Sequence, residues 1–374
     1  MIIVALNESP EDTRVAITPG AVKQYSKLGF EIFCESGAGN GSGFSDEDYE
    51  QAGAKITANR SEVLHLANIV ACVNEPTPAM LSALPAGALV VAHIDNNPES
   101  ELLTWACKQQ VDLFSMTLIP RISRAQSMDS LSSQANLAGY RAVLEGVNHF
   151  HRAVPMMMTA AGMIHPAKIL VLGAGVAGLQ AIATAKRLGA VVYAFDVRRA
   201  AKEQVESLGA EFIEVDEGQD NETSGGYAGE MSEEYKKLQA ELIAKYAKLS
   251  DIVICTALIP GRKAPVLLPK QVVEQMKPGS VVVDLATSRG GNCEVSVKDQ
   301  VSQFNQVTIV GYSNMAGLVP ATASELYATN LVNLVRLLVS APGALVFNPE
   351  DEIIKQAMLT HNGQYMPFQH GQGG

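Results

Sequence analysis

The sequence predicts an α/β fold of two doubly wound parallel-sheet domains joined by two long helices. Short runs rich in β-branched residues alternate with helix-like runs along almost the whole chain, which is typical of parallel sheets covered by helices on both faces. The chain has 374 residues, of which 47% are hydrophobic, and this length is too great for a single core.

The N-terminal third of the chain contains five expected strands with four expected helices between them. The strands fall at residues 1–6, 31–36, 68–73, 88–94 and 111–119, and the helices at 20–29, 46–54, 78–84 and 99–110. The region that follows repeats the scheme, with strands expected at 167–173, 191–197, 211–215, 251–257, 280–286 and 307–313. This repetition indicates two sheets rather than one.

Two longer helical stretches flank the second set of strands. One covers about residues 131–150 and the other about residues 322–340. The second has an apolar stripe at helical spacing. The stripe consists of Leu326, Leu331, Leu334, Leu337 and Leu338. We therefore expect a first domain formed by residues 1–132 and 325–374, an inserted second domain at 133–324, and a binding site in the crevice between them.

Composition and charge restrict the kind of partner. The net charge is -11 and the pI about 5.2, and an acidic surface repels phosphate backbones, so we expect no nucleic-acid partner. The five cysteines have no spacing typical of a metal or redox site, so we expect reduced core thiols and no metal. We find no export signal and no apolar stretch of the roughly 18 to 20 residues that span a bilayer, so the chain itself is expected to be soluble.

The glycines between a strand and a helix near the middle of the chain are the strongest functional signal. Gly173, Gly175 and Gly178 form G-x-G-x-x-G directly after an expected strand. In this motif the first glycine permits a tight turn, the second lets backbone approach a pyrophosphate, and the third lets the helix pack on the strand. The helix N-terminus favours the diphosphate. The sequence therefore predicts a Rossmann-like dinucleotide-binding domain.

An acidic residue after the next strand indicates which dinucleotide binds. Asp196 ends that strand, and a carboxylate in this position bonds to the ribose hydroxyls and repels a 2′-phosphate, which favours NAD(H) over NADP(H). Arg198 and Arg199 follow closely and could bind a 2′-phosphate, which leaves NADP(H) as the lesser alternative.

A polar loop at residues 121–135, "RISRAQSMDSLSSQA", lies between the two sets of strands. Gln126, Asp129 and Ser132 are three residues apart, so they would share one side of a helical turn. Hydroxyl side chains here could instead cap the following helix. The candidate capping residues are Ser130, Ser132 and Ser133. The residues alone favour the capping interpretation.

Several segments resemble the NAD(H)-binding component of proton-translocating NAD(P) transhydrogenase, a family related to alanine dehydrogenase. These segments are 120–143, 173–190, 196–212, 225–235, 256–267 and 279–294. The resemblance implies direct hydride transfer between NAD(H) on this chain and NADP(H) on a partner. In such a reaction the cofactors carry the chemistry, and the protein holds two nicotinamide rings together and excludes water.

The resemblance assigns the polar loop to the nicotinamide half of NAD(H). It implies that Arg121 contacts the diphosphate or carboxamide, Gln126 reaches toward the second nucleotide, and Asp129 orients the carboxamide or Arg121. Ser132 would contact the carboxamide, and residues 225–235 would close over the nucleotide. The further cofactor-binding residues that it implies are Ile122, Ser123, Ser127, Met128, Gly173, Ala174, Gly175, Val176, Gly178, Asp196, Val197, Arg198, Gly226, Tyr227, Gln239 and Leu258.

The resemblance also implies the partners and the location. This chain has one dinucleotide motif, so the NADP(H) site and the proton channel would lie on an NADP(H)-binding subunit and a membrane-spanning transhydrogenase subunit. We expect a homodimer bound peripherally on the cytoplasmic side of a bacterial inner membrane.

The main alternative is a stand-alone NAD-dependent amino-acid dehydrogenase similar to alanine dehydrogenase, and a regulatory NAD-binding module is a third. Alanine dehydrogenases keep an arginine, a lysine, a histidine and an aspartate. Arg14 and His93 are present here, but Asn74 and Ser288 replace the lysine and the aspartate. Reduction of a carbonyl needs groups that polarise it and transfer a proton, so this alternative is disfavoured. We then expect His93 to be structural and the methionines at 156–158 to pack in the interior.

Overall fold

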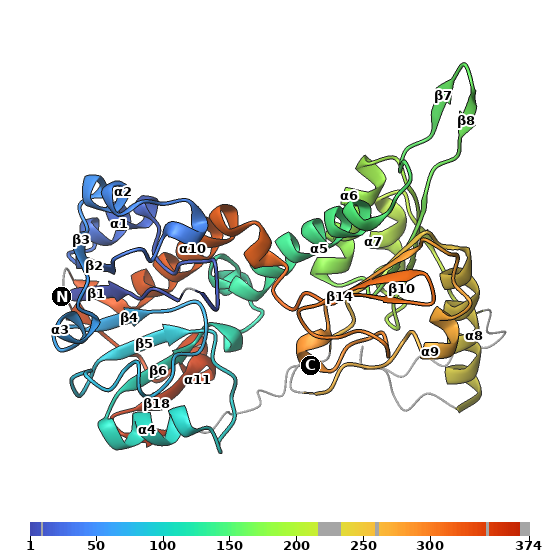
Figure 1. The fold of residues 1–374 in the computed structure, drawn as a ribbon. Coiled ribbons are helices and arrows are strands. Elements are labelled where there is room, and N and C mark those ends of the chain that lie inside the picture. Colours follow the sequence, from blue (N-terminus) through green and yellow to red (C-terminus); the bar gives the residue numbers. More distant parts are fainter. Residues whose placement is uncertain (9, 216–232, 259–261, 342–343, 367–374) are drawn as a thin grey trace. The chain divides into compact units, whose positions relative to one another are not determined.

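The computed structural model describes residues 1–8, 10–215, 233–258, 262–341 and 344–366. The chain forms two compact units (Figure 1). Unit 1 comprises Met1–Gln134 and Gly317–Gly374, and unit 2 comprises Ala135–Ala316. Each unit has its own doubly wound sheet, which confirms the predicted fold class. The chain passes from unit 1 to unit 2 within helix α5 (Ser130–His149).

Unit 1 is built on an eight-stranded sheet in the order β19-β18-β6-β5-β4-β1-β2-β3. Its parallel strands are β1 (Ile2–Ala5), β2 (Glu31–Glu35), β3 (Lys55–Thr57), β4 (Ile69–Ala71), β5 (Leu89–Ala92) and β6 (Asp112–Ser115). β18 (Met358–His361) and β19 (Gln364–Tyr365) add an antiparallel edge. The strand order reverses between β1 and β4, and doubly wound sheets bind ligands outside the carboxyl ends of the strands at such a point.

The helices of unit 1 begin at residues that favour a helix start. They are α1 (Pro19–Lys27), α2 (Asp46–Ala52), α3 (Arg60–Leu64), α4 (Glu101–Gln109), α10 (Pro320–Leu338) and α11 (Glu352–Ala357). The side chains of Thr18, Ser45 and Asp351 accept hydrogen bonds from amides in the first turns of α1, α2 and α11. Such caps satisfy backbone donors that have no partner inside the helix.

The prediction of a helix at residues 78–84 is wrong. This segment forms consecutive turns, in which the amides of Leu81 and Leu84 donate to carbonyls three residues back. Pro85 disfavours helical backbone at the residue before it, which leaves too few residues for a stable helix. Leu81 and Leu84 are nevertheless buried, so the apolar pattern identified a core segment but not its conformation.

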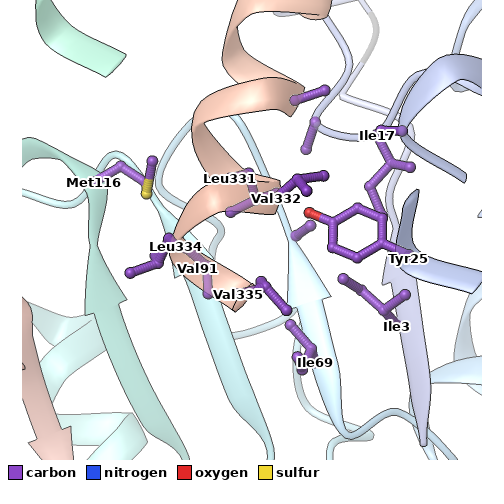
Figure 2. Packing of buried hydrophobic residues seen from close by; sticks show 14 of the residues in the cluster. Ile3, Ile17, Tyr25, Ile69, Val91, Met116, Leu331, Val332, Leu334 and Val335 are labelled. Atoms are coloured by element: carbon purple, nitrogen blue, oxygen red, sulfur yellow. The ribbon is translucent and has the colours of Figure 1, made fainter. Parts of the chain in front are cut away.

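Helix α10 packs against the sheet of unit 1 (Figure 2). Leu331, Leu334 and Val335 are fully buried, in one cluster with Ile69 and Val91 of the strands. Burial of side chains of this size contributes about 1.5–3 kcal/mol each. These buried side chains hold α10 in the core of unit 1. The same helix also contacts the polar loop, through Asn330.

One residue of the predicted stripe on α10 does not belong to it. Leu326 is 38% exposed, whereas Tyr327 beside it is fully buried. The helix face that meets the core passes through positions three and four residues apart. Those positions include Ala323, Tyr327, Leu331, Leu334 and Leu338.

Unit 2 is built on a seven-stranded sheet in the order β11-β10-β9-β12-β13-β15-β14. The strands are β9 (Lys168–Leu172), β10 (Val191–Phe195), β11 (Glu211–Phe212), β12 (Ile252–Cys255), β13 (Val281–Asp284), β14 (Val301–Phe304) and β15 (Val307–Val310). All pairs are parallel except β14 with β15. The helices are α6 (Val176–Arg187), α7 (Ala201–Ser207), α8 (Glu233–Leu249) and α9 (Lys270–Val273). The order reverses between β9 and β12, which is the expected ligand edge of this unit.

A two-stranded hairpin, β7 (Met157–Thr159) and β8 (Gly162–Ile164), extends from unit 2 as an arm (Figure 1). The prediction that the three methionines here pack in the interior is wrong, because Met156, Met157 and Met158 are 61%, 39% and 74% exposed. An apolar run is typical both of a core segment and of an exposed apolar surface, so the pattern alone did not separate the two.

A second small hairpin joins β16 (Val339–Ala341) to β17 (Ala344–Leu345). Within the described residues, every helix is too short or too polar to be a candidate membrane span.

Candidate functional site

The glycine-rich turn of unit 2 connects β9 to α6. Gly173 has a φ of 104°, in the left-handed region, and a Cβ there would lie 2.6 Å from the hydroxyl of Thr256. A Cβ at Gly178 would lie 1.8 Å from the carbonyl oxygen of Gly173, so the helix and the turn meet with no room for a side chain. Both positions therefore require glycine.

Gly175 has a different role, because a Cβ there would meet no atom within 4 Å. It is the N-cap residue of α6, and as a glycine it supplies no side-chain acceptor to the first-turn amides. A helix N-terminus of this kind offers N–H groups and a positive dipole end to an anion. Together with its neighbours Ala174 and Val176, it suits a diphosphate that approaches the backbone closely.

Asp196 follows β10 and is bonded to the glycine-rich turn. Its Oδ2 accepts the Ala174 amide at 2.7 Å, and its Oδ1 accepts the Arg198 amide at 2.8 Å. The Arg198 guanidinium adds bonds of 3.0 Å to each oxygen. Burial opposes ionisation of Asp196, but the hydrogen bonds from Arg198 and Ala174 outweigh it and hold the pKa of this carboxyl below its usual range. A fixed carboxylate thus lies at the end of β10, beside the turn, where a ribose acceptor is needed.

The polar loop of unit 1 forms a short 3₁₀ helix, Ser123–Met128, before α5 begins. Asp129 lies between the two and accepts hydrogen bonds from Ser132, at 2.9 Å from its amide and 2.5 Å from its hydroxyl. A side-chain cap of this kind stabilises a helix by about 0.5–2 kcal/mol. Both oxygens of Asp129 bond to Ser132, and among the described residues Arg121 is not a hydrogen-bond partner of this carboxylate.

The loop has a buried base and an exposed polar face. Ala125 and Met128 lie in the core of unit 1, and the Arg124 guanidinium bonds to both oxygens of Asp351 at 2.8 and 2.7 Å. Ile122 packs against the core as a partly buried residue. Besides Arg124, the exposed residues of residues 121–130 are Arg121, Ser123, Gln126 and Ser127. The loop can therefore present a guanidinium, an amide and two hydroxyls to a ligand while its backbone is held from below.

The remaining predicted contact residues lie in unit 2. Val197 is 47% exposed beside Asp196, and Leu258 is 50% exposed just after β12. Gln239 is partly exposed on α8. Gly226 and Tyr227 lie outside the described residues.

A second polar cluster lies in unit 1 near the ends of β1 and β4, and sequence reasoning did not identify it as a group. The Arg14 guanidinium binds Asp12 at 3.0 and 2.7 Å and Gln134 at 2.9 Å. The Asn74 amide donates to Asp12 at 2.8 Å and to Glu8 at 3.2 Å. The comparison with alanine dehydrogenase had singled out Arg14 and Asn74 separately, but no sequence signal pointed to Gln134, which is 120 residues away from Arg14. The carboxylate of Asp12 thus neutralises the Arg14 cation.

Burial shifts the pKa values of two residues in this region. It raises the pKa of Glu8 to about 7, although the amides of Val73 and Asn74 donate to its carboxylate and lower the pKa. It lowers the pKa of His93 to about 4, and the charge of Arg14 lowers it further. His93 Nε2 lies 2.8 Å from the hydroxyl of Ser130. His93 is therefore neutral at pH 7 and has a structural partner at the start of α5.

The chain matches two family models over most of its length. The N-terminal domain of alanine dehydrogenase/PNT matches residues 4–138, and the C-terminal domain matches residues 142–367. An NAD(P) transhydrogenase subunit alpha protein of Rhodospirillum rubrum is 48% identical over 100% of this chain and 99% of its own length.

Solved structures give the same relationship. A transhydrogenase structure from Sinorhizobium meliloti has a TM-score of 0.89 and 47% identity, with coverage of 98% of this chain and all of the other. An L-alanine dehydrogenase structure has a TM-score of 0.80 but 26% identity, with coverage of 98% of this chain and 96% of the other. Because the backbone is shared more widely than the sequence, the higher identity separates the two kinds of relative. The chain therefore belongs to the alanine dehydrogenase/PNT family, in which it is more similar to transhydrogenase alpha subunits than to alanine dehydrogenases.

Proposed function

We propose that this protein is the NAD(H)-binding component of a proton-translocating NAD(P) transhydrogenase. It holds NAD(H), and a hydride passes directly between that nicotinamide and the nicotinamide of NADP(H) on a partner subunit, coupled to proton translocation. The 48% identity to a transhydrogenase alpha subunit supports the activity, and the observation that supports the NAD(H) site is the 2.7 Å bond from the Ala174 amide, which joins the glycine-rich turn to Asp196. This connection combines a diphosphate site with a ribose acceptor that disfavours NADP(H).

The two units have different tasks in this proposal. Unit 2 binds the adenosine and diphosphate, and unit 1 supplies the polar loop. In the loop, Arg121 and Gln126 contact the nicotinamide half and the second nucleotide. Direct transfer between two rings requires no protein base, because the cofactors carry the reaction and the protein supplies orientation.

We also propose the assembly that the reaction needs. NADP(H) is bound by a second subunit, and a membrane-spanning subunit carries the proton, so this chain is attached peripherally on the cytoplasmic side of the membrane. A second copy of this chain covers the hairpin arm. Met158 and Met163, at 74% and 49% exposed, support this dimer, because apolar side chains concentrated on a projecting arm are typical of an interface.

The proposal is tested by mixing the purified chain with separately prepared NADP(H)-binding subunit. NADPH and an oxidised NAD analogue of distinct absorbance are added, and formation of the reduced analogue is followed. We expect reduction only when both proteins are present. Tight binding of NADH and NADPH to their respective proteins without any reduction would instead favour the regulatory NAD-binding module.

The amino-acid dehydrogenase alternative makes an opposite prediction. Its substrate would carry a carboxylate that needs a free cation, but the Arg14 guanidinium is bonded to Asp12 and Gln134. His93, with a pKa lowered to about 4, is a poor proton donor at neutral pH. We expect no NAD reduction with alanine and no NADH oxidation with pyruvate and ammonium. Robust turnover in either direction would reverse the ranking.

A further inference from the structure

Helix α10 holds the polar loop through one buried amide side chain. Asn330 Nδ2 donates to the carbonyl oxygen of Ser127 at 2.8 Å, and Asn330 Oδ1 accepts from the hydroxyl of Ser133 at 2.8 Å. Ser127 belongs to the 3₁₀ helix of the loop, and Ser133 to the first turn of α5. One side chain therefore connects the segments on the two sides of Asp129. All of these residues belong to unit 1.

Packing does not explain an amide at this position. Its neighbours on the buried face of α10, Tyr327, Leu331 and Leu334, are fully buried, and Asn330 itself is 8% exposed. Burial of a polar amide is unfavourable unless it forms hydrogen bonds, and both ends of this amide bond to the loop and the start of α5. Asn333, about one turn further and partly exposed, donates to the same Ser127 carbonyl at 3.1 Å.

The bond to the Ser127 carbonyl controls the direction in which the loop presents its side chains. A peptide unit is planar, so a fixed carbonyl fixes the whole plane between Ser127 and Met128. Ala125 and Met128 are buried on either side. Because Ala125 and Met128 are held in the core and the Ser127 peptide is held by Asn330, the backbone between them leaves Gln126 exposed to solvent. The Arg124 pair with Asp351 restrains the other end of the same short helix.

We propose that Asn330 is a positioning residue for hydride transfer: it holds the loop so that Gln126 and Arg121 meet the nucleotides correctly. This inference rests on the proposed function of the loop. Asn330 touches no reacting atom. Its effect is on orientation, and displacement of groups that position reactants by about 1 Å can lower a rate by roughly a hundredfold.

The test compares Asn330→Asp with a control on the same helix. The aspartate has nearly the same size and keeps the acceptor for Ser133, but it places an oxygen against the Ser127 carbonyl oxygen. Asn330→Ala removes both bonds and serves if the first variant does not fold. Thr329→Ala is the matched control, because Thr329 is exposed and its hydroxyl bonds to the Glu325 carbonyl of the same helix at 2.8 Å.

Three measurements are made on each protein. Amide hydrogen exchange reports on residues 121–133, NADH titration gives the Kd of the isolated chain, and single-turnover transfer from NADPH to an NAD analogue is timed in the complete complex. For Asn330→Asp we expect faster exchange in the loop and transfer slowed about ten- to a hundredfold. The NADH Kd should change by a smaller factor, because the proposed diphosphate and ribose contacts in unit 2 are untouched. Thr329→Ala should match the parent in all three. A purely structural role would instead weaken NADH binding and slow transfer by the same factor.

Two results would overturn the inference and leave the proposed function intact. One is loop exchange in both Asn330 variants that equals the parent. The other is faster exchange with an unchanged transfer rate. A parent complex that transfers no hydride at all would overturn the proposed function and the role of Asn330 with it, so the two failures are distinguishable.

Discussion

Replacement of Asp196 by alanine tests the cofactor selectivity of unit 2. The side chain of Asp196 is 7% exposed and that of Arg198 is 51% exposed, so the carboxylate is fixed while the guanidinium can move. Hydrogen bonds to a charged group contribute about 1.5–3 kcal/mol. Loss of the ribose acceptor should therefore raise the Kd for NADH by roughly 10- to 150-fold, at about 1.4 kcal/mol for each factor of ten.

The same change should favour NADPH. Without Asp196, the Arg198 guanidinium loses its two bonds of 3.0 Å and can pair with a 2′-phosphate, which the carboxylate no longer repels. The double variant Asp196→Ala with Arg198→Ala should bind NADH like the single variant but lose the gain for NADPH. Asp196→Asn is the matched control, because it keeps an acceptor for the Ala174 amide and removes only the charge.

Fluorescence titration of each variant with NADH and NADPH measures both affinities. Amide hydrogen exchange of residues 173–180 checks that the turn is intact, since loss of the Ala174 bond would also loosen the start of α6. If Asp196→Ala weakens both nucleotides equally, so that the ratio of the two Kd values stays constant, the ribose is recognised elsewhere and the argument for NAD(H) at this turn fails.

Three further predictions concern the loop, the buried acid and the arm. Gln126→Asn should slow hydride transfer while NADH affinity stays close to that of the parent, because Gln126 is proposed to reach the second nucleotide. A large loss of NADH binding would place Gln126 at NAD(H) instead. The pKa of Glu8 is raised from 4.5 to about 7 in the folded state. Its protonation therefore contributes stability that is present below pH 4.5 and is lost as pH rises through 7. The pKa of His93 is lowered from 6.5 to about 4, so His93 makes the free energy of unfolding rise with pH over that range. Glu8→Gln should therefore make urea-unfolding stability rise more steeply, or fall less, between pH 5 and 7, and an identical pH profile would contradict the raised pKa. Met158→Asp should shift sedimentation from dimer to monomer without lowering the melting temperature, because Met158 is 74% exposed, and a persistent dimer would place the interface elsewhere.

Local sequence determined the nucleotide turn. The φ of 104° at Gly173 and the 1.8 Å approach at Gly178 are demands that only glycine meets, and both are set by residues within one strand, turn and helix. The period of the apolar residues likewise predicted the two sheets and placed α10 and α5 within a few residues of their observed bounds. It could not distinguish the turns at 78–84 from a helix, because both bury the same leucines.

The support of the polar loop and the neutralisation of Arg14 were decided only by the tertiary structure. Asn330 lies 203 residues from Ser127, and Gln134 lies 120 residues from Arg14. No local spacing signals such a pair, because the energy of a buried hydrogen bond depends on where the fold brings two distant segments together. The exposure of Met156, Met157 and Met158 was also hidden, because apolar residues occur both in the core and on the surface and the fold decides which.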